Sequence, residues 1–364
     1  MLDEIFAHIG YGNFILVLAI LIFVHELGHY LAARSCGIRV EVFSIGFGPE
    51  IFGYNDRHGT RWKLSLIPLG GYVKMFGEML PGLNPDQKSL TLAQEKFAFH
   101  TQPLWARAIV VSAGPLANFI YAFAVLWMVF FLIGKSETPD FKTHGIGFVS
   151  EQSPAEASGL QKDDKILAIN DVPIHHFDDL RNQVIASQGK PLTLNVMRET
   201  QIFDVKIIPE QIQNDQGPSY RLGIGAQAPI LQQKGLIESA LLAAGETWNM
   251  IWLTLKAIGE LISGQRDQSE LGGPIKIAQI SSDVAQTGLL ALIVFTVILS
   301  VNLGLLNLLP VPILDGGYLL FCLYEAVTGA PPSAKVQNWA MRFGVAFIGT
   351  LIIFVTINDI LSLF

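Results

Sequence analysis

The residues best suited to chemistry in this 364-residue chain form one pentad, His25, Glu26, Leu27, Gly28 and His29. Residues four apart on a helix point to nearly the same side, so both imidazoles can bind one metal ion while Glu26 flanks the same site. Zinc is the metal expected for this pattern. The pentad predicts a metal-dependent hydrolase, but so short a pattern also arises by chance, and its surroundings must decide.

The pentad lies within a long apolar stretch. The whole chain is 51% hydrophobic and only 15% charged, which is too apolar for an ordinary soluble protein. Histidine and glutamate are expensive to bury in a membrane and are expected there mainly where they serve a site. The alternative that His25 and His29 only hydrogen-bond to neighbouring helices stays open.

A catalytic zinc site needs a third protein ligand and one open position for water. Asp315 is the candidate, because it ends the run NLLPVPILD, which begins at Asn307 and closes another apolar stretch. The Asp-Gly-Gly string is also a common turn signal, and that interpretation remains possible. Prolines and asparagines within an apolar span nevertheless favour a broken helix that lines a cavity. We therefore expect Asp315 to meet His25 and His29.

Four apolar stretches are long enough to cross a bilayer. A cleavable signal peptide is disfavoured for the first, because it begins with the acidic pair Asp3 and Glu4. Lysines and arginines are concentrated between the first two stretches and predict that residues 34–103 are cytoplasmic, with both termini outside. The expected spanning helices are residues 1–33, 104–134, 288–314 and 341–364.

The connecting segments differ in character. Residues 34–103 contain short β-like runs punctuated by glycine and predict hairpins that dip into the membrane. Residues 144–210 resemble a bacterial PDZ domain, on the string SPAEASGLQKDDKILAINDVPI, and residues 145–148 are interpreted as its first strand. Residues 211–287 are expected to hold a linker and amphipathic surface helices, because residues 236–263 carry charges at helical spacing.

Taken together, these motifs resemble the site-2 proteases (peptidase family M50B), in the RseP-type bacterial branch, over essentially the whole chain. The resemblance rests on HELGH, the string from Gly114 to Asn118, Asn302 and NLLPVPILDGG, which occur in the family's order. It implies a polytopic α-helical membrane protein with about four transmembrane helices. It also implies a membrane-associated β-hairpin region and one inserted extracytoplasmic PDZ domain. The best-studied relatives carry two PDZ domains, whereas this chain has room for one.

The same resemblance implies a role for particular residues. One Zn²⁺ per chain would be held by His25, His29 and Asp315, with Glu26 as the catalytic acid/base. Residues of the β-hairpin region and two asparagines would bind or stabilise the substrate. These are Asn302, Asn307, Gly70, Gly71, Tyr72, Val73 and Lys74.

The function implied is that of an intramembrane zinc endopeptidase in a bacterial inner membrane. Its expected partners are lipid and single-span membrane proteins, such as an anti-sigma factor or signal-peptide remnants, after a first cut by another protease. No nucleic-acid partner is expected.

Two other classes of protein could carry the same residues. A metal transporter also places histidine and acidic residues in the membrane, but no internal repeat is visible here. A catalytically inactive receptor that uses its PDZ domain is disfavoured by the intact Glu26.

Overall fold

The computed structural model describes residues 12–77, 91–137, 145–174, 177–214, 217–226, 230–265 and 272–361. The chain divides into two compact units, and each is described by itself. The larger unit combines Met1–Met128 with Ile237–Phe364, and the smaller unit is Val129–Leu236.

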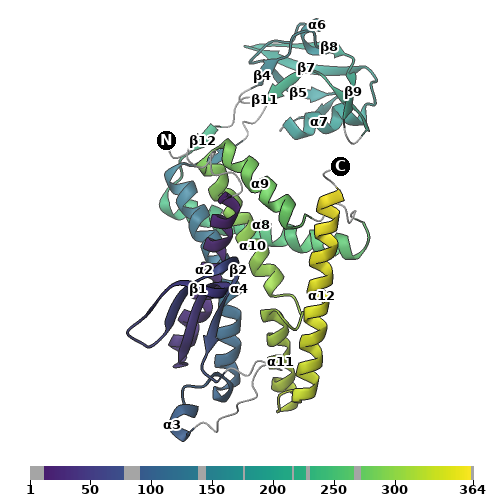
Figure 1. Cartoon of the computed structure of the whole chain (residues 1–364). Coiled ribbons are helices and arrows are strands. Elements are labelled where there is room, and N and C mark those ends of the chain that lie inside the picture. The colour runs from purple at the N-terminus through teal and green to yellow at the C-terminus, as the bar shows by residue number, and fades with distance from the viewer. Residues whose placement is uncertain are drawn as a thin grey trace. The chain divides into compact units, whose positions relative to one another are not determined.

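The larger unit is a helical bundle (Figure 1). Among the described residues, four helices are long and apolar enough to cross a membrane, as expected from the sequence: α2 (Gly12–Ser35), α4 (Leu104–Leu132), α10 (Leu289–Asn307) and α12 (Ala334–Leu361). Helix α12 begins seven residues before the expected position 341, because its polar first turns are also helical. The third expected span reached residue 314, but α10 ends at Asn307, since the prolines that follow cannot continue a helix.

Among the described residues, this unit also contains the longer helices α8 (Leu236–Ile262), α9 (Pro274–Thr287) and α11 (Asp315–Thr328). Helix α8 carries four charged side chains and is not among the candidate spans, in line with the expected amphipathic helix. Two of those charges, Lys256 and Glu260, form an ion pair of 3.7 Å along the helix. Helix α11 was not foreseen, because its apolar residues continue those of the preceding span.

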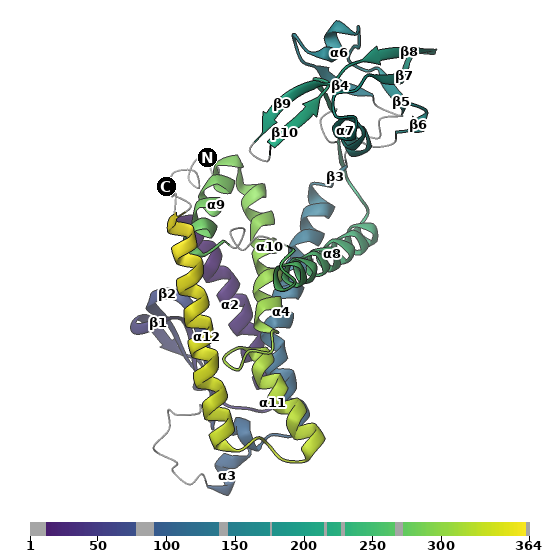
Figure 2. The ribbon, with the colours of Figure 1, turned by 90° about the vertical axis from the view of Figure 1, so that its right-hand side faces the viewer.

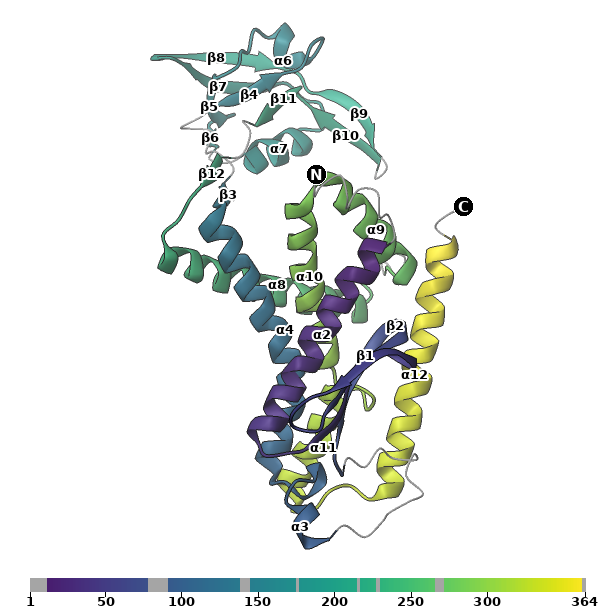
Figure 3. The same ribbon diagram turned by 60° about the vertical axis from the view of Figure 1, so that its left-hand side comes forward.

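A β-hairpin lies beside α2 (Figure 3). Its strands are β1 (Val40–Asn55) and β2 (Arg61–Met75), followed along the chain by α3 (Leu92–Glu95) and a 3₁₀ turn, η1 (Phe99–Thr101). Each strand bends, so that Ser44 pairs with both Lys63 and Tyr72. The hairpin therefore forms four short segments in the order 50–55, 61–65, 42–45 and 71–75. In the described part of the chain, residues 71–75 pair on one side only.

One carboxylate fastens the hairpin turn to α2. Asp56 Oδ2 accepts hydrogen bonds from Tyr30 Oη and Trp62 Nε1, both at 3.0 Å, and Oδ1 accepts from the backbone N–H groups of His58 and Thr60. Burial raises the pKa of Asp56, but these hydrogen bonds outweigh it and lower the pKa to about 2. The group therefore stays ionised at neutral pH and holds the turn against the helix.

The hairpin, α2 and α4 share an apolar core. Phe43 stacks on Trp62 with ring centroids 4.2 Å apart. The buried members of this core are Tyr30, Ala33, Ile38, Val40, Phe43, Val73, Met75, Phe99, Val110 and Val111.

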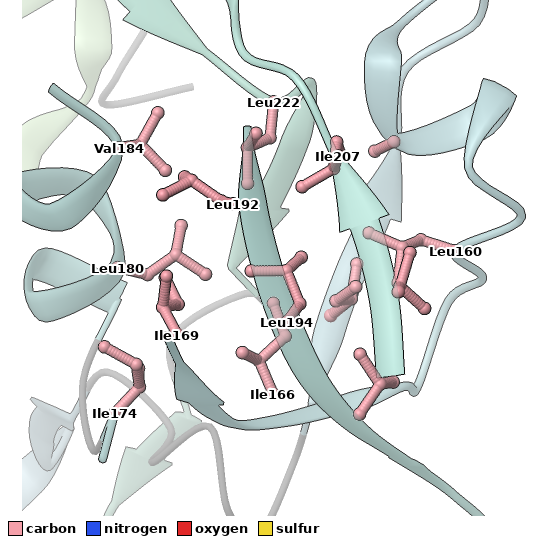
Figure 4. Packing of buried hydrophobic residues seen from close by; sticks show 14 residues of the cluster. Leu160, Ile166, Ile169, Ile174, Leu180, Val184, Leu192, Leu194, Ile207 and Leu222 are labelled. Atoms are coloured by element: carbon pink, nitrogen blue, oxygen red, sulfur yellow. The ribbon is translucent and has the colours of Figure 1, made fainter. Parts of the chain in front are cut away.

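The smaller unit contains mostly strands. Its main sheet has the order β6-β5-β7-β8 and packs against α7, as the close view of its core shows (Figure 4). The elements are β3 (Lys135–Glu137), β4 (Ile146–Val149), α6 (Pro154–Ala157), β5 (Lys165–Ile169), β6 (Val172–Pro173), α7 (Phe177–Ala186), β7 (Leu192–Arg198), β8 (Gln201–Ile207), β9 (Glu210–Asn214), β10 (Gly217–Arg221), β11 (Ile224–Ala226) and β12 (Ile230–Gln232).

The expected boundary of this unit at residue 210 is too early. Residues 211–235 were predicted to be a polar linker, yet they contain strands, and β11 pairs with β4 so that Ile224 lies opposite Val149. Leu222 is buried in the core of the unit. The segment resembles a linker in sequence because it is polar and punctuated by glycine and proline.

Helix α12 is tied to the start of α9 (Figure 2). The buried carboxylate of Asp359 accepts hydrogen bonds from the backbone N–H groups of Gly273, Ile275 and Lys276, at 2.8 to 3.0 Å. These N–H groups have no partner within α9, and a negative charge at a helix N-terminus is favourable. Asp359 thus completes α9 and joins it to α12.

Replacing Asp359 should loosen this junction. We expect Asp359→Ala to reduce the free energy of unfolding by about 3 kcal/mol, because three buried N–H groups lose a charged acceptor. Asp359→Asn, which keeps one acceptor oxygen, should lose less. Thermal unfolding in detergent measures both, with Ile357→Ala on the exposed face of the same helix as the control. An equal loss in Ile357→Ala would contradict this account.

Candidate metal centre

Three side chains predicted from the sequence meet at one point. His25 and His29 lie one turn apart on α2, with their Nε2 atoms 3.2 Å apart. Asp315 is the first residue of α11, and its Oδ2 lies 3.2 Å from His25 Nε2 and 3.5 Å from His29 Nε2. These are the residues of the described chain that could hold a metal ion together.

The donor atoms fit zinc. Tetrahedral zinc with bonds of about 2.0–2.1 Å places its ligand atoms about 3.3 Å apart, close to the three separations observed. Asp315 Oδ2 is buried and faces the two Nε2 atoms, but it accepts no hydrogen bond of normal geometry from the described residues; a cation would satisfy such an acceptor. Two imidazoles and a carboxylate are a donor set of catalytic zinc sites and leave a fourth position for water.

A tight return of the chain brings Asp315 to the histidines. Helix α10 ends at Asn307, residues 308–314 turn back, and α11 begins at Asp315. A Cβ on Gly316 or Gly317 would overlap the carbonyl groups of the returning segment. The Asp-Gly-Gly string is therefore more than a turn signal, because its glycines let α11 start against the backbone that precedes it.

Helix α4 contacts both histidines at their Nδ1 atoms. His29 Nδ1 lies 2.8 Å from the carbonyl oxygen of Val110, to which it donates when Nε2 faces a metal. A Cβ on Gly114 would overlap the His29 ring, and a Cβ on Gly28 would overlap the backbone of α4 at Ala113. Sequence reasoning missed this role of α4. The small residues at these positions were the available signal, since such residues mark close helix contacts in membranes.

The predicted catalytic residue Glu26 lies beside His25 and is 8% exposed. On the hairpin, Gly71 lies close to it, because a Cβ on Gly71 would lie 3.0 Å from Glu26 Cγ. The start of the edge segment 71–75 therefore lies against the Glu26 side chain, and a residue larger than glycine would not fit at position 71.

The other predicted hairpin residues are engaged within the hairpin. Val73 is buried in the shared core, Lys74 pairs with Glu41 at 2.9 Å, and the Tyr72 ring stacks on Phe47. Gly70 has a φ of +107°, a conformation that favours glycine.

The two predicted asparagines lie on α10. Asn302 Oδ1 accepts a hydrogen bond of 2.9 Å from Thr254 Oγ1 of α8, and Asn302 lines a cavity of about 1060 Å³ among α2, α8, α9 and α10. Asn307 Nδ2 donates to the Leu303 carbonyl of its own helix at 3.1 Å. In these described hydrogen bonds, neither asparagine contacts the three converging side chains.

Gly114 gives a direct test of the support by α4. The Cβ of Gly114→Ala would push the His29 ring out of place, so we expect at least a tenfold loss of zinc affinity. Metal analysis after chelator competition measures this. Gly349→Ala is the matched control, because a Cβ there meets no atom within 4 Å. Full zinc occupancy in Gly114→Ala under competition would contradict the proposed packing.

Comparison with known proteins identifies the family of the chain. The sequence matches the family described as Peptidase family M50 over residues 13–351. A relative from Rhizobium meliloti is 39% identical over 97% of this chain and 96% of its own length. One from Rickettsia conorii is 39% identical over 97% and 98%, and one from Campylobacter jejuni is 37% identical over 95% and 92%. Each is named "Putative zinc metalloprotease". The chain belongs to peptidase family M50 and is a zinc metalloprotease of that family.

Proposed function

We propose that this metalloprotease is an intramembrane endopeptidase that cuts peptide bonds within transmembrane segments of single-span membrane proteins. The observation that carries the proposal is that His25, His29 and Asp315, all on helices of the larger unit, meet at one point. Two of the three come from α2, a helix long and apolar enough to cross the bilayer. A cut at this site would therefore be made at membrane depth. The three residues act as zinc ligands in this proposal.

The chemistry is general acid/base hydrolysis. When bound, zinc lowers the pKa of a water molecule and polarises the peptide carbonyl. Glu26, next to His25, would act as the acid/base: it would accept a proton from the attacking water and give it to the leaving nitrogen. Asn307 supplies an amide N–H that can turn from the Leu303 carbonyl toward the developing oxyanion. Burial of Glu26 keeps bulk water away from this exchange.

Two variants separate binding of the metal from catalysis. Glu26→Gln should keep zinc and lower the cleavage rate by at least about 10²-fold, because the amide cannot accept the proton. Asp315→Ala should lose both zinc and cleavage. Purified protein in detergent, assayed on a single-span reporter substrate and for metal content, tests both. Cleavage by Asp315→Ala at the parental rate would overturn the proposed ligand set.

The substrate must be unwound before it is cut, because helix carbonyls are hydrogen-bonded within the helix. The edge segment 71–75 can pair with an unwound stretch by β-augmentation. Two observations support this role: the segment pairs on one side only in the described chain, and Gly71 lies against Glu26. A substrate strand added here would pass the catalytic carboxylate. Asn302, at the cavity among the helices, is proposed to contact the substrate as well.

Proline substitution along the edge tests the pairing. Alternate N–H groups of an edge strand point outward, so proline at Tyr72, Val73, Lys74 and Met75 in turn should affect cleavage with a period of two. Where the N–H points outward, we expect the variant to lose cleavage but to keep its zinc content and its thermal stability. Where it points inward, the hairpin itself should weaken. Phe52→Pro, on the opposite edge segment, is the control. Unchanged cleavage in all four variants would exclude β-augmentation.

The smaller unit is proposed to be a single PDZ domain on the extracytoplasmic side. Its four-stranded sheet, its helix α7 and the β4–β11 pair support this assignment. Its proposed role is to admit substrates by the size of their outside portion. The proposed setting is a bacterial inner membrane, and the proposed substrates are an anti-sigma factor or signal-peptide remnants already cut by another protease. Membership of a protease family favours this function over a receptor or a transporter.

A further inference from the structure

His25 has a neighbour on α4 that the function described so far does not use. The side-chain amide of Asn118 lies against the His25 ring, with Nδ2 3.2 Å from Nδ1. Asn118 is fully buried, and its Oδ1 has no hydrogen-bond partner among the described residues. A buried amide oxygen without a partner is costly, and it calls for an explanation.

The protonation of His25 supplies that explanation. His25 Nε2 faces His29 Nε2 and Asp315 Oδ2, so Nε2 is the nitrogen that can bind a metal. A neutral imidazole carries one proton, which must then reside on Nδ1. Nδ1–H can only donate, and an amide NH₂ beside it would set two donors face to face. Exchanging Asn118 Oδ1 and Nδ2 by a half-turn of the amide puts the acceptor at 3.2 Å from Nδ1.

We propose that Asn118 is a positioning residue for the metal centre: its Oδ1 accepts the Nδ1–H of His25 and so fixes the ring and the tautomer that present Nε2 to zinc. The inference rests on the proposed ligand role of His25. Metal-binding histidines commonly donate their second N–H to such an acceptor, and loss of the acceptor weakens metal binding 10- to 100-fold.

The geometry of α4 makes this role part of a larger pattern. Val110, Gly114 and Asn118 are spaced by four residues, so they lie along one side of the helix. Val110 offers its carbonyl to His29, Gly114 leaves room for the His29 ring, and Asn118 faces His25. Ser300 of α10 donates to the Asn118 backbone carbonyl at 2.9 Å, a contact that does not involve the amide. One side of α4 thereby sets both imidazoles.

The test measures zinc affinity by chelator competition in the Glu26→Gln background, where proteolysis plays no part. Asn118→Leu keeps the side-chain volume and removes the acceptor, and we expect zinc to bind 10- to 100-fold more weakly. Asn118→Asp offers only acceptor oxygens and should bind zinc at least as tightly as the parent. Ser300→Ala is the control, because it touches the backbone of Asn118 and not the amide, and its affinity should stay within about threefold of the parent.

The two Asn118 variants decide the matter together. If Asn118→Asp binds zinc as weakly as Asn118→Leu, the amide does not accept from His25 and the proposal is wrong. Parental affinity in Asn118→Leu would equally overturn it. Thermal unfolding of the zinc-free proteins shows whether either variant has lost its fold, and Asn118→Asp then serves as the rescue. If the parent itself binds no zinc, the proposed ligand role of His25 fails instead.

Discussion

Close contact between α2 and α4 is the interaction on which the rest of the site depends. Gly28 lies against the α4 backbone at Ala113, and Gly114 lies against the His29 ring. Within a bilayer the hydrophobic effect does not drive helices together, so small residues that allow close packing carry much of the association. Here the same closeness places the Val110 carbonyl within hydrogen-bonding distance of His29. The same close contact therefore determines both the packing of α2 against α4 and the orientation of the His29 ring.

The position of Asp315, the third proposed ligand, depends on a different constraint, the break between α10 and α11. A continuous helix through residues 308–314 would carry Asp315 about 12 Å further along the axis of α10, at 1.5 Å per residue over eight residues. The prolines prevent that, and Gly316 and Gly317 allow α11 to begin beside the returning backbone. Irregular backbone at membrane depth is tolerated where protein covers it. This break brings the carboxylate to the histidines on α2.

How far the sequence predicted this arrangement depended on the range of the interactions involved. The pair His25 and His29, and the four apolar helices, follow from local periodicity, so they could be read directly. Asp315 could be predicted because topology placed it at the same end of the bundle as the pentad. The support from α4 and the strands after residue 210 depend on contacts between distant segments, which periodicity does not record. The small residues on α4 indicate a close helix contact, but the sequence does not show that the contacting helix is α2.

Helix α2 holds both the proposed catalytic residue, Glu26, and Tyr30, which fastens the hairpin turn. Tyr30, which follows His29 on α2, donates a hydrogen bond to Asp56 at the hairpin turn. Gly71 of the edge segment lies against Glu26 of the same helix. In the proposed mechanism, a substrate strand paired with that edge is aligned by α2 itself. The pKa of Asp56 is lowered to about 2, so its contribution is present above the ordinary aspartate pKa and is lost only as the pH falls toward 2. Asp56 therefore stays ionised throughout the neutral range. In the proposed mechanism, it gives the alignment of the substrate strand with Glu26 no pH dependence there.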